Sequence, residues 1–186
     1  MGDIVRVQSN DTAFFRPKDI YNDRQHIRQT TLQGLTATQR WIAILEEQGF
    51  HHTVQYVENK VKAVFWTYPW CITMWKMFPQ VLGMDNTYKT NRFKMYLFQV
   101  SGITDQKSAA NFTFGLTDTE KEVGYDWLCG QIDSLRGQLG IPTPDVVITD
   151  KEMALKNSLQ SFSPQTQQQL CIFHINANVK GKINLR

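Results

Sequence analysis

Residues 81–91 read VLGMDNTYKTN, an apolar run that ends in an acid, Asp85, and continues with small and polar residues. A strand that only fills a core rarely carries a carboxylate at such a position. An isolated buried acid is costly, so it normally has a partner charge, a hydrogen-bond network or a metal ion. The stretch therefore predicts a strand whose carboxyl-terminal half holds a partnered or functional carboxylate.

The chain downstream of this strand alternates between strand-like and helix-like patterns. Three strand-like runs follow one another across short polar turns, which indicates antiparallel neighbours. Two helical patterns then alternate with two short apolar runs, as in strands buried on both faces. The order β-β-β-α-β-α-β predicts an α/β fold with a mixed five-stranded sheet and helices on its faces. The expected strands cover 81–88, 93–104, 109–118, 144–150 and 169–175, and the expected helices cover 121–139 and 151–162.

The chain upstream is expected to form an extension, residues 1–79, that precedes the domain at 80–186. Its first part is polar and expected to be partly helical. Thr36 and Gln39 have the spacing of a capping box, which predicts that a helix begins after Thr36. Alternating residues over 51–69 predict a strand pair that turns at Asn59 and Lys60, and residues 71–79 predict a short helix.

Two acids occupy equivalent places in this pattern. Asp85 lies late in the first strand, and Asp150 ends the run VVITD. Because the two strands are predicted to be parallel, the acids are expected to be neighbours in space. Two carboxylates so placed repel each other unless a cation lies between them, and Mg²⁺ or Mn²⁺ prefers oxygen ligands. The alternative for Asp150 is a helix N-cap, since a helix is predicted directly after it.

Composition excludes several classes of protein. The 186 residues include 41% hydrophobic residues and carry a net charge of +3, which permits a nucleic-acid partner without requiring one. Cys71, Cys129 and Cys171 are widely spaced, which is typical of reduced thiols. The amino-terminal stretch has no apolar signal region and no window is long and apolar enough for a membrane span. We therefore expect a protein that is not secreted and has no membrane partner.

Three segments together resemble the catalytic domain of Mutator-like element (MULE) transposases. They are DNTYKTNRFKMYLF at 85–98, VVITDKEMALKNSL at 146–159 and LCIFH at 170–174. The matching residues are Asp85, Thr87, Tyr88 and Asn91 in the first segment, Thr149, Asp150, Ala154 and Leu155 in the second, and Cys171 and His174 in the third.

The resemblance implies a ribonuclease H-like fold and a DDE triad that uses Mg²⁺ or Mn²⁺ to cleave and transfer DNA strands. Asp85 and Asp150 would be its first two acids, with Thr87, Tyr88, Asn91, Cys171 and His174 in supporting roles. It implies DNA, in the family the transposon ends, as the partner, and the nucleus or else the cytoplasm as the location. It assigns no DNA-binding residue.

The third acid of the family, a glutamate on a helix well beyond the C-x-x-H motif, has no counterpart here. The stretch after His174 contains no acid, and Glu120 and Glu122 do not match that position. The expected domain thus lacks the last catalytic helix. We expect a transposase catalytic-domain fragment that is inactive alone, since losing one group of a multi-residue site commonly costs about 10³-fold or more.

Two other interpretations stay open. The chain could be a non-catalytic, transposase-derived module that binds DNA or protein, with possible self-association through a surface exposed near the last strand. It could instead be a complete nuclease whose third acid is Asp105, Asp118 or Glu120. On a strand, Cys171 and His174 would face opposite sides and could not share one ion, so a packing role is expected for them. Tyr88 and Arg92 are interpreted as a packed ring and a solvated cation, or as groups that approach DNA.

Overall fold

The computed structural model describes residues 17–87, 91 and 94–183. These residues form two compact units, 1–44 and 45–186, of which only the described parts are discussed. The helices are α1 (Pro17–Leu32), α2 (Ala37–Glu47), α3 (Pro69–Met77), α4 (Glu122–Gln138), α5 (Met153–Phe162) and α6 (Ile172–Ile183). The strands are β1 (His51–Val57), β2 (Lys60–Thr67), β3 (Val81–Thr87), β4 (Tyr96–Ile103), β5 (Ala109–Thr117), β6 (Val146–Thr149) and β7 (Gln167–Leu170).

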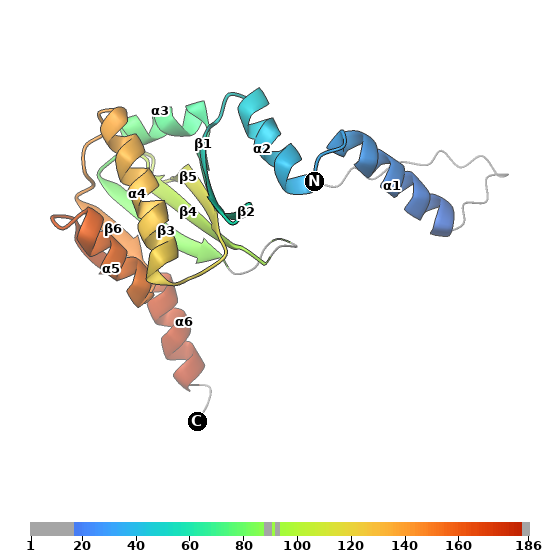
Figure 1. The fold of residues 1–186 in the computed structure, drawn as a ribbon. Helices are drawn as coiled ribbons and strands as arrows, with labels where there is room; N and C mark the ends of the chain where they lie inside the picture. The colour runs from blue at the N-terminus through green and yellow to red at the C-terminus, as the bar shows by residue number, and fades with distance from the viewer. Residues whose placement is uncertain (1–16, 88–90, 92–93, 184–186) are drawn as a thin grey trace. The chain divides into compact units, whose positions relative to one another are not determined.

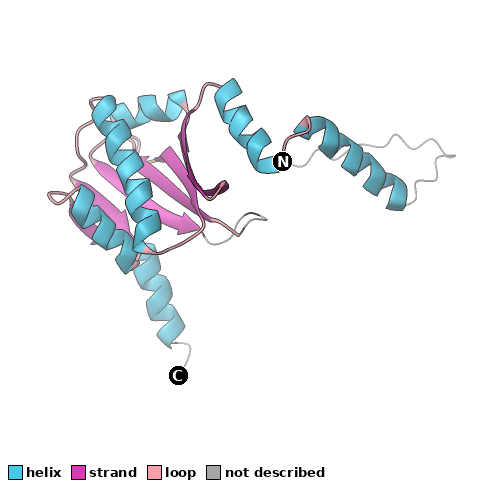
Figure 2. Cartoon of the chain, viewed as in Figure 1, coloured by secondary structure: helices cyan, strands magenta, loops and turns pink. Residues whose placement is uncertain are grey.

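All seven strands belong to one mixed sheet, in the order β1-β2-β5-β4-β3-β6-β7. Figure 2 shows strands of this sheet in magenta, with helices packed against it. β3, β4 and β5 are antiparallel neighbours, whereas β6 and β7 run parallel to β3. The predicted order β-β-β-α-β-α-β is found from β3 to β7. The sheet has seven strands and not the predicted five, because β2 pairs with β5 and adds the β1–β2 hairpin at that edge.

The β1–β2 hairpin lies in the second compact unit of the chain. The extension was expected to end at residue 79, whereas β1, β2 and α3 fall within the unit that begins at Leu45. The hairpin turns at Glu58 and Asn59, one residue before the expected place, and both residues have positive φ. Such a turn matches the twist of the paired strands.

The helices of the sequence prediction upstream are present. α1 covers most of the polar segment that was expected to be partly helical. The capping box is confirmed, because Thr36 Oγ1 accepts from the Gln39 N–H at 3.3 Å and Gln39 Oε1 accepts from the Thr36 N–H at 2.9 Å. α3 corresponds to the short helix expected at 71–79, and its proline is at the first turn, where a missing N–H costs nothing.

The predicted last strand is present as β7, but its predicted bounds, 169–175, are wrong. β7 is the polar segment QQQL, and the chain leaves the sheet at Cys171, whose N–H donates to the Thr149 carbonyl at 2.7 Å. Helix α6 then begins at Ile172, and the carbonyl of Cys171 accepts its first hydrogen bond, from the Ile175 N–H. An apolar run of this length fits a strand or a helix equally well, so periodicity alone could not decide.

The core lies between the sheet and its helices, with α4 and α5 across one face (Figure 1). Leu82 and Met84 of β3 alternate with more exposed neighbours, so one face of this strand is buried against the helices. The largest fully buried side chains are Trp75 of α3, Tyr125 of α4 and Phe65, Phe98 and Phe112 of the sheet.

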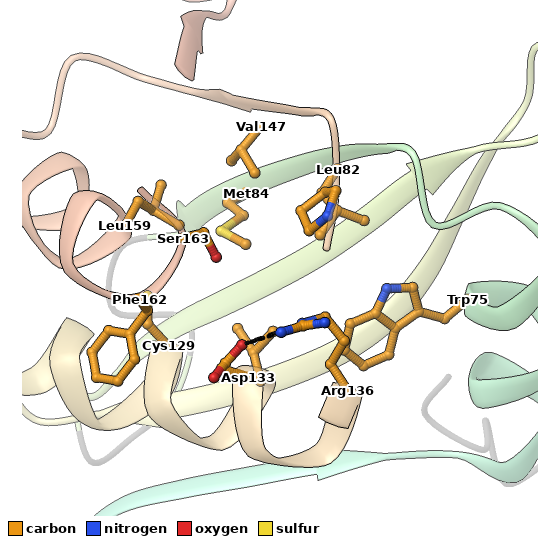
Figure 3. Close-up of a pocket in the computed structure, with 12 residues that line it drawn as sticks. Trp75, Leu82, Met84, Cys129, Asp133, Arg136, Val147, Leu159, Phe162 and Ser163 are labelled. Carbon is orange, nitrogen blue, oxygen red and sulfur yellow. Dashed lines mark hydrogen bonds and ion pairs between the residues drawn. The ribbon is translucent and has the colours of Figure 1, made fainter. Parts of the chain in front are cut away.

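A small cavity of about 20 Å³ lies within this core, between α4, α5 and the sheet (Figure 3). Trp75, Met84, Cys129 and Leu159 are among the side chains that line it. At its edge the Arg136 guanidinium binds the Asp133 carboxylate at 2.6 Å. Burial raises the pKa of Cys129 to about 12, so its thiol stays neutral at ordinary pH. The cavity is therefore a packing feature, since it is too small for a ligand of the usual size.

Candidate active site at the carboxyl ends of β3 and β6

The register of β3 and β6 brings the two predicted acids to one end of the sheet. Val81, Leu82 and Gly83 pair in parallel with Val146, Val147 and Ile148. Asp85 and Asp150 each lie two residues beyond the last of these pairs, so both are at the same end of the sheet. Asp85 alternates with Leu82 and Met84 along β3, so it belongs to the face away from these core residues. Asp150 lies just beyond the end of β6.

Asp85 is solvent-accessible, with its side chain 54% exposed. Its Oδ1 atom lies 4.0 Å from Nε2 of His174 on α6. An exposed ion pair at this distance contributes little to stability. The pair nevertheless shows that α6 brings an imidazole next to the first acid, a proximity that the sequence did not predict.

Asp150 follows β6 directly and is partly buried. Its Oδ1 atom accepts from the Glu152 N–H at 2.9 Å, which forms a tight turn before α5. The N-cap of α5 is Glu152, whose Oε1 accepts from the Ala154 N–H at 3.2 Å. The alternative reading of Asp150 as the helix N-cap is therefore wrong, and its Oδ2 atom is not used by this turn.

A polar network lies on the opposite side of β3 from Asp85. The Asn86 carboxamide donates to Glu120 Oε1 at 2.9 Å and to the Tyr125 hydroxyl at 3.0 Å. Burial raises the pKa of Tyr125, and the carboxylates of Glu120, Glu152 and Asp150 raise it further, while the Asn86 hydrogen bond lowers it. The tyrosine therefore stays a neutral hydroxyl, and Asn86 fixes the end of β3 that carries Asp85.

The sequence did not indicate this network as a functional feature. Asn86 follows Asp85, so the two-residue period of a strand places it on the core face. This two-residue period could have indicated a hydrogen-bond network, because a carboxamide on a core face needs partners. The identity of the partners, Glu120 and Tyr125, depends on the packing of α4 and could not be inferred from spacing.

The other residues of the first motif lie in or near the β3–β4 connection. Thr87 is the last residue of β3 and pairs with Leu97. Asn91 bonds the Met95 backbone twice, with Nδ2 donating to the carbonyl at 2.8 Å and Oδ1 accepting from the N–H at 3.2 Å. Asn91 thus shapes the β3–β4 connection. Tyr88 and Arg92 lie outside the described residues.

Cys171 and His174 lie at the start of α6 and not on a strand. Residues three apart at a helix start share a face, so the argument that they face opposite sides does not apply. Both line a groove of about 280 Å³ together with Asp150. The C-x-x-H motif therefore reaches the same end of the sheet as the acids.

Asp105, Asp118 and Glu120 were the alternatives for the third catalytic acid, and their surroundings differ. Asp105 lies in the β4–β5 turn, at the opposite end of β3 from Asp85. Asp118 binds the Lys62 ammonium at 2.6 Å. Glu120 follows β5 at the same end as Asp85, but it binds Asn86. Within the part of the chain that the structure describes, no three His, Cys, Asp or Glu side chains gather closely enough to hold a metal ion.

This geometry defines a class of protein, namely a mixed α/β domain that carries two acids at the carboxyl ends of adjacent parallel strands. The family profile described as "MULE transposase domain" matches residues 81–178, which span β3 through most of α6. The chain belongs to the MULE transposase domain family, as the sequence motifs predicted.

Curated relatives match as parts of longer proteins. The PKS-NRPS hybrid synthetase cheA of Chaetomium globosum is 32% identical over 179 residues, which is 92% of this chain and 4% of that protein. The Arabidopsis thaliana protein FAR1-RELATED SEQUENCE 4 is 24% identical over 70% of this chain and 18% of its own length. FAR1-RELATED SEQUENCE 5, from the same plant, is 22% identical over 91% of this chain and 22% of its own length.

Proposed function

We propose that this domain supplies the first two carboxylates for metal-dependent DNA strand cleavage and transfer of the MULE type. Asp85 and Asp150 are the catalytic pair in this proposal. We also propose that β3 through β7 form a ribonuclease H-like core, to which the β1–β2 hairpin is an addition. The order of elements from β3 to β7 supports this assignment.

One observation carries the proposal, namely the parallel register between β3 and β6. It sets two acids that are 65 positions apart in the chain at adjacent strand ends. Either acid alone has an ordinary structural explanation. Their arrival at one end of the sheet, where a glutamate and a histidine also lie, does not follow from packing needs.

The donor atoms fit a hard divalent ion. Mg²⁺ is usually bound by one or two carboxylates and keeps several waters or substrate oxygens. Asp85 is open to solvent, and Asp150 retains an oxygen that its turn does not use. Asp85 and Asp150 would hold Mg²⁺ or Mn²⁺, which when bound supplies a Lewis acid that polarises a phosphodiester and lowers the pKa of water.

The chain's own residues prepare this site. Asn86 holds the end of β3 through Glu120 and Tyr125, so the Asp85 backbone is fixed before any ligand arrives. The Glu152 N–H orients the Asp150 carboxylate. Such preorganisation matters because small displacements of catalytic groups cost large factors in rate. With two acids and no third in the described cluster, we propose that this chain alone binds the ion weakly and does not cleave DNA.

Mn²⁺ should raise the melting temperature of the wild-type chain and should leave Asp85→Ala unchanged. An ion that binds only the folded state at about ten times its Kd adds about 1.4 kcal/mol, or roughly 3–5 °C for a domain of this size. Differential scanning fluorimetry with and without millimolar MnCl₂ measures the shift.

Asp105→Ala is the matched control, because it removes another exposed acid, at the other end of the sheet. The control should keep the full Mn²⁺ shift. Equal shifts in wild type and Asp85→Ala would show that the ion binds elsewhere, and the proposal would be abandoned.

A second candidate is a non-catalytic, transposase-derived DNA-binding module. It is favoured by the small number of acids at the site and by the engagement of Asp85 with His174. The same melting experiment separates the candidates. Under the second one, Mn²⁺ leaves the melting temperature unchanged although the chain still binds DNA.

Partner and location follow from the same proposal. Members of a transposase family act on DNA, so we propose DNA as the partner and the nucleus as the place of action. No helix in the ranges 17–87 and 94–183 has the length and apolar character needed to cross a bilayer.

A further inference from the structure

We infer that helix α6 binds an amphipathic helix of another protein, one whose apolar stripe is flanked by carboxylates. Such a partner is separate from the DNA and the divalent ion proposed above, and its binding needs neither Asp85 nor Asp150. Three properties of α6 indicate this partner, namely an exposed apolar face, the heptad spacing of that face and the charges on its two sides.

The apolar side chains of α6 are exposed along the whole helix. Ile172, Val179 and Ile183 are 72%, 50% and 66% exposed, and Phe173 is 75% exposed. No residue from Ile172 to Ile183 is buried, and Figure 1 shows α6 extending away from the sheet. A helix of this length gains most of its stability from packing an apolar face. Since the described residues leave this face open, a partner outside them is needed to bury it.

Four residues form a narrow seam along α6, spaced by four, three and four positions: Ile172, Asn176, Val179 and Ile183. This is the spacing of the d and a positions in a heptad repeat. At about 100° per residue, the four side chains lie within about 60° of one another around the helix axis. A seam this narrow is typical of a helix that pairs with one other helix, whereas a helix that faces a core or lies on a membrane presents a wider apolar face. Asn176 is polar at an a position, where such a residue fixes the register of a helix pair.

Two lysines flank the seam, one on each side. Lys180 and Lys182 follow Val179 by one and three residues, so they lie about 70–90° to either side of the seam. The segment from Ile172 to Ile183 contains no Asp or Glu. Charges at these flanking positions select the partner in a helix pair. Carboxylates on the partner would face the lysines, so the charges favour an acidic amphipathic helix.

The same features disfavour other occupants of the seam. A second copy of α6 would bring four ammonium groups and no carboxylate to it. A nucleic-acid backbone would pair with the lysines but leave Ile172, Val179 and Ile183 in water. An acidic helix covers the apolar seam and also neutralises the lysines. Because α6 has about three turns, the contact belongs with the small, transient interfaces that bury less than about 1,200 Å².

The test uses two synthetic helices that differ only in their flanking charge. Both are three-heptad peptides with leucine at every a and d position. One carries glutamate at every e and g position, and the other carries lysine there. Each peptide is labelled with a fluorophore and titrated with the full chain, and binding is followed by fluorescence anisotropy. The acidic peptide should bind at least about ten times more tightly than the basic peptide.

Reversing the two charges should reverse this preference. Lys180→Glu with Lys182→Glu should weaken binding of the acidic peptide about tenfold and strengthen binding of the basic peptide. Lys60→Glu with Lys107→Glu is the matched control, because it changes the net charge equally at two exposed lysines outside α6. The control should keep the wild-type preference. A gain in binding of the basic peptide cannot come from a helix that has failed to fold.

A second pair of substitutions tests the apolar part of the seam. Ile172→Ala should weaken binding of the acidic peptide about five- to tenfold, the order expected when a buried isoleucine is truncated. Val123→Ala is the control and should leave binding unchanged. Val123 lies in the first turn of α4 and is 66% exposed, against 72% for Ile172 in the first turn of α6. Alanine is a good helix former at both positions.

Three results would overturn the inference. The first is equal binding of the two peptides, or binding of neither. The second is a wild-type chain that is dimeric by light scattering and becomes monomeric in Ile172→Ala, because a second copy would then cover the seam. The third is binding to phosphatidylserine vesicles that Ile172→Ala abolishes, because a lipid surface would then be the occupant.

Discussion

Replacing Trp75 with alanine should lower the free energy of unfolding by about 3–5 kcal/mol, the usual cost of removing a large aromatic side chain from a core. Trp75 is fully buried and stacks on Phe112, with ring centroids 6.2 Å apart and an interplanar angle of 16°. It already borders a small cavity, which its removal would enlarge. Since domains are stable by only about 5–15 kcal/mol, this one substitution should populate the unfolded state.

Guanidinium chloride unfolding, followed by far-UV circular dichroism, measures this loss. Trp70→Ala is the matched control, because Trp70 lies on the same helix and is 62% exposed. The control should change the free energy of unfolding by less than about 1 kcal/mol. Similar losses for both tryptophans would contradict the placement of α3 against β5.

Replacing Gly102 with alanine should destabilise the domain by about 1–3 kcal/mol or more through overpacking. Gly102 lies in β4 and pairs with Leu82 of β3 and Ala110 of β5. A Cβ atom there would come within 2.2 Å of two ring atoms of Phe112, which is itself fully buried. The ring cannot retreat without disturbing the core.

Gly137→Ala provides the comparison for this second substitution. Gly137 lies in α4, and a Cβ atom there would have no neighbour within 4 Å. Gly137 lies in the last turn of α4, where alanine is still favoured over glycine, so this substitution should stabilise the domain by up to about 0.5–1 kcal/mol. Thermal unfolding of both variants measures the difference in sign, and a stabilised Gly102→Ala would show that β4 and β5 are not packed as described.

The sequence was most informative where one physical pattern dominated. In β3, the apolar residues that end in Asp85 predicted the strand, although the acid, expected at a core-adjacent position, is exposed. In α2, Thr36 and Gln39 fixed the beginning of the helix through two local hydrogen bonds. Each prediction depended on neighbours in the chain, so no tertiary information was needed.

The sequence was least informative at the last strand and helix. β7 is a polar edge segment, QQQL, whose backbone pairs with β6 although its side chains carry no strand pattern. The apolar residues Ile172, Phe173 and Ile175 belong to α6, where they remain exposed. Apolar periodicity predicts secondary structure because apolar residues are normally buried. Here the helix exposes its apolar residues and the neighbouring strand is polar, so the pattern predicted a strand where the helix begins.

For the site, the sequence predicted the acids but not their surroundings. Parallel pairing of β3 with β6 followed from the order of elements, and it brings Asp85 and Asp150 to one edge. The approach of His174 depends on the chain turning at Cys171, and the Asn86 network depends on α4. Both are consequences of tertiary packing, which residue spacing does not determine.

The central claim is that Asp85 and Asp150 share one divalent ion, and a double-mutant cycle tests it most directly. The Mn²⁺-induced rise in melting temperature is measured for the wild type, Asp85→Ala, Asp150→Ala and the double substitution. If one ion needs both acids, each single substitution should abolish the Mn²⁺-induced rise in melting temperature. The double substitution should then show no further loss. Single substitutions that each remove part of the rise, with losses that add in the double, would mean separate ions and would contradict the account.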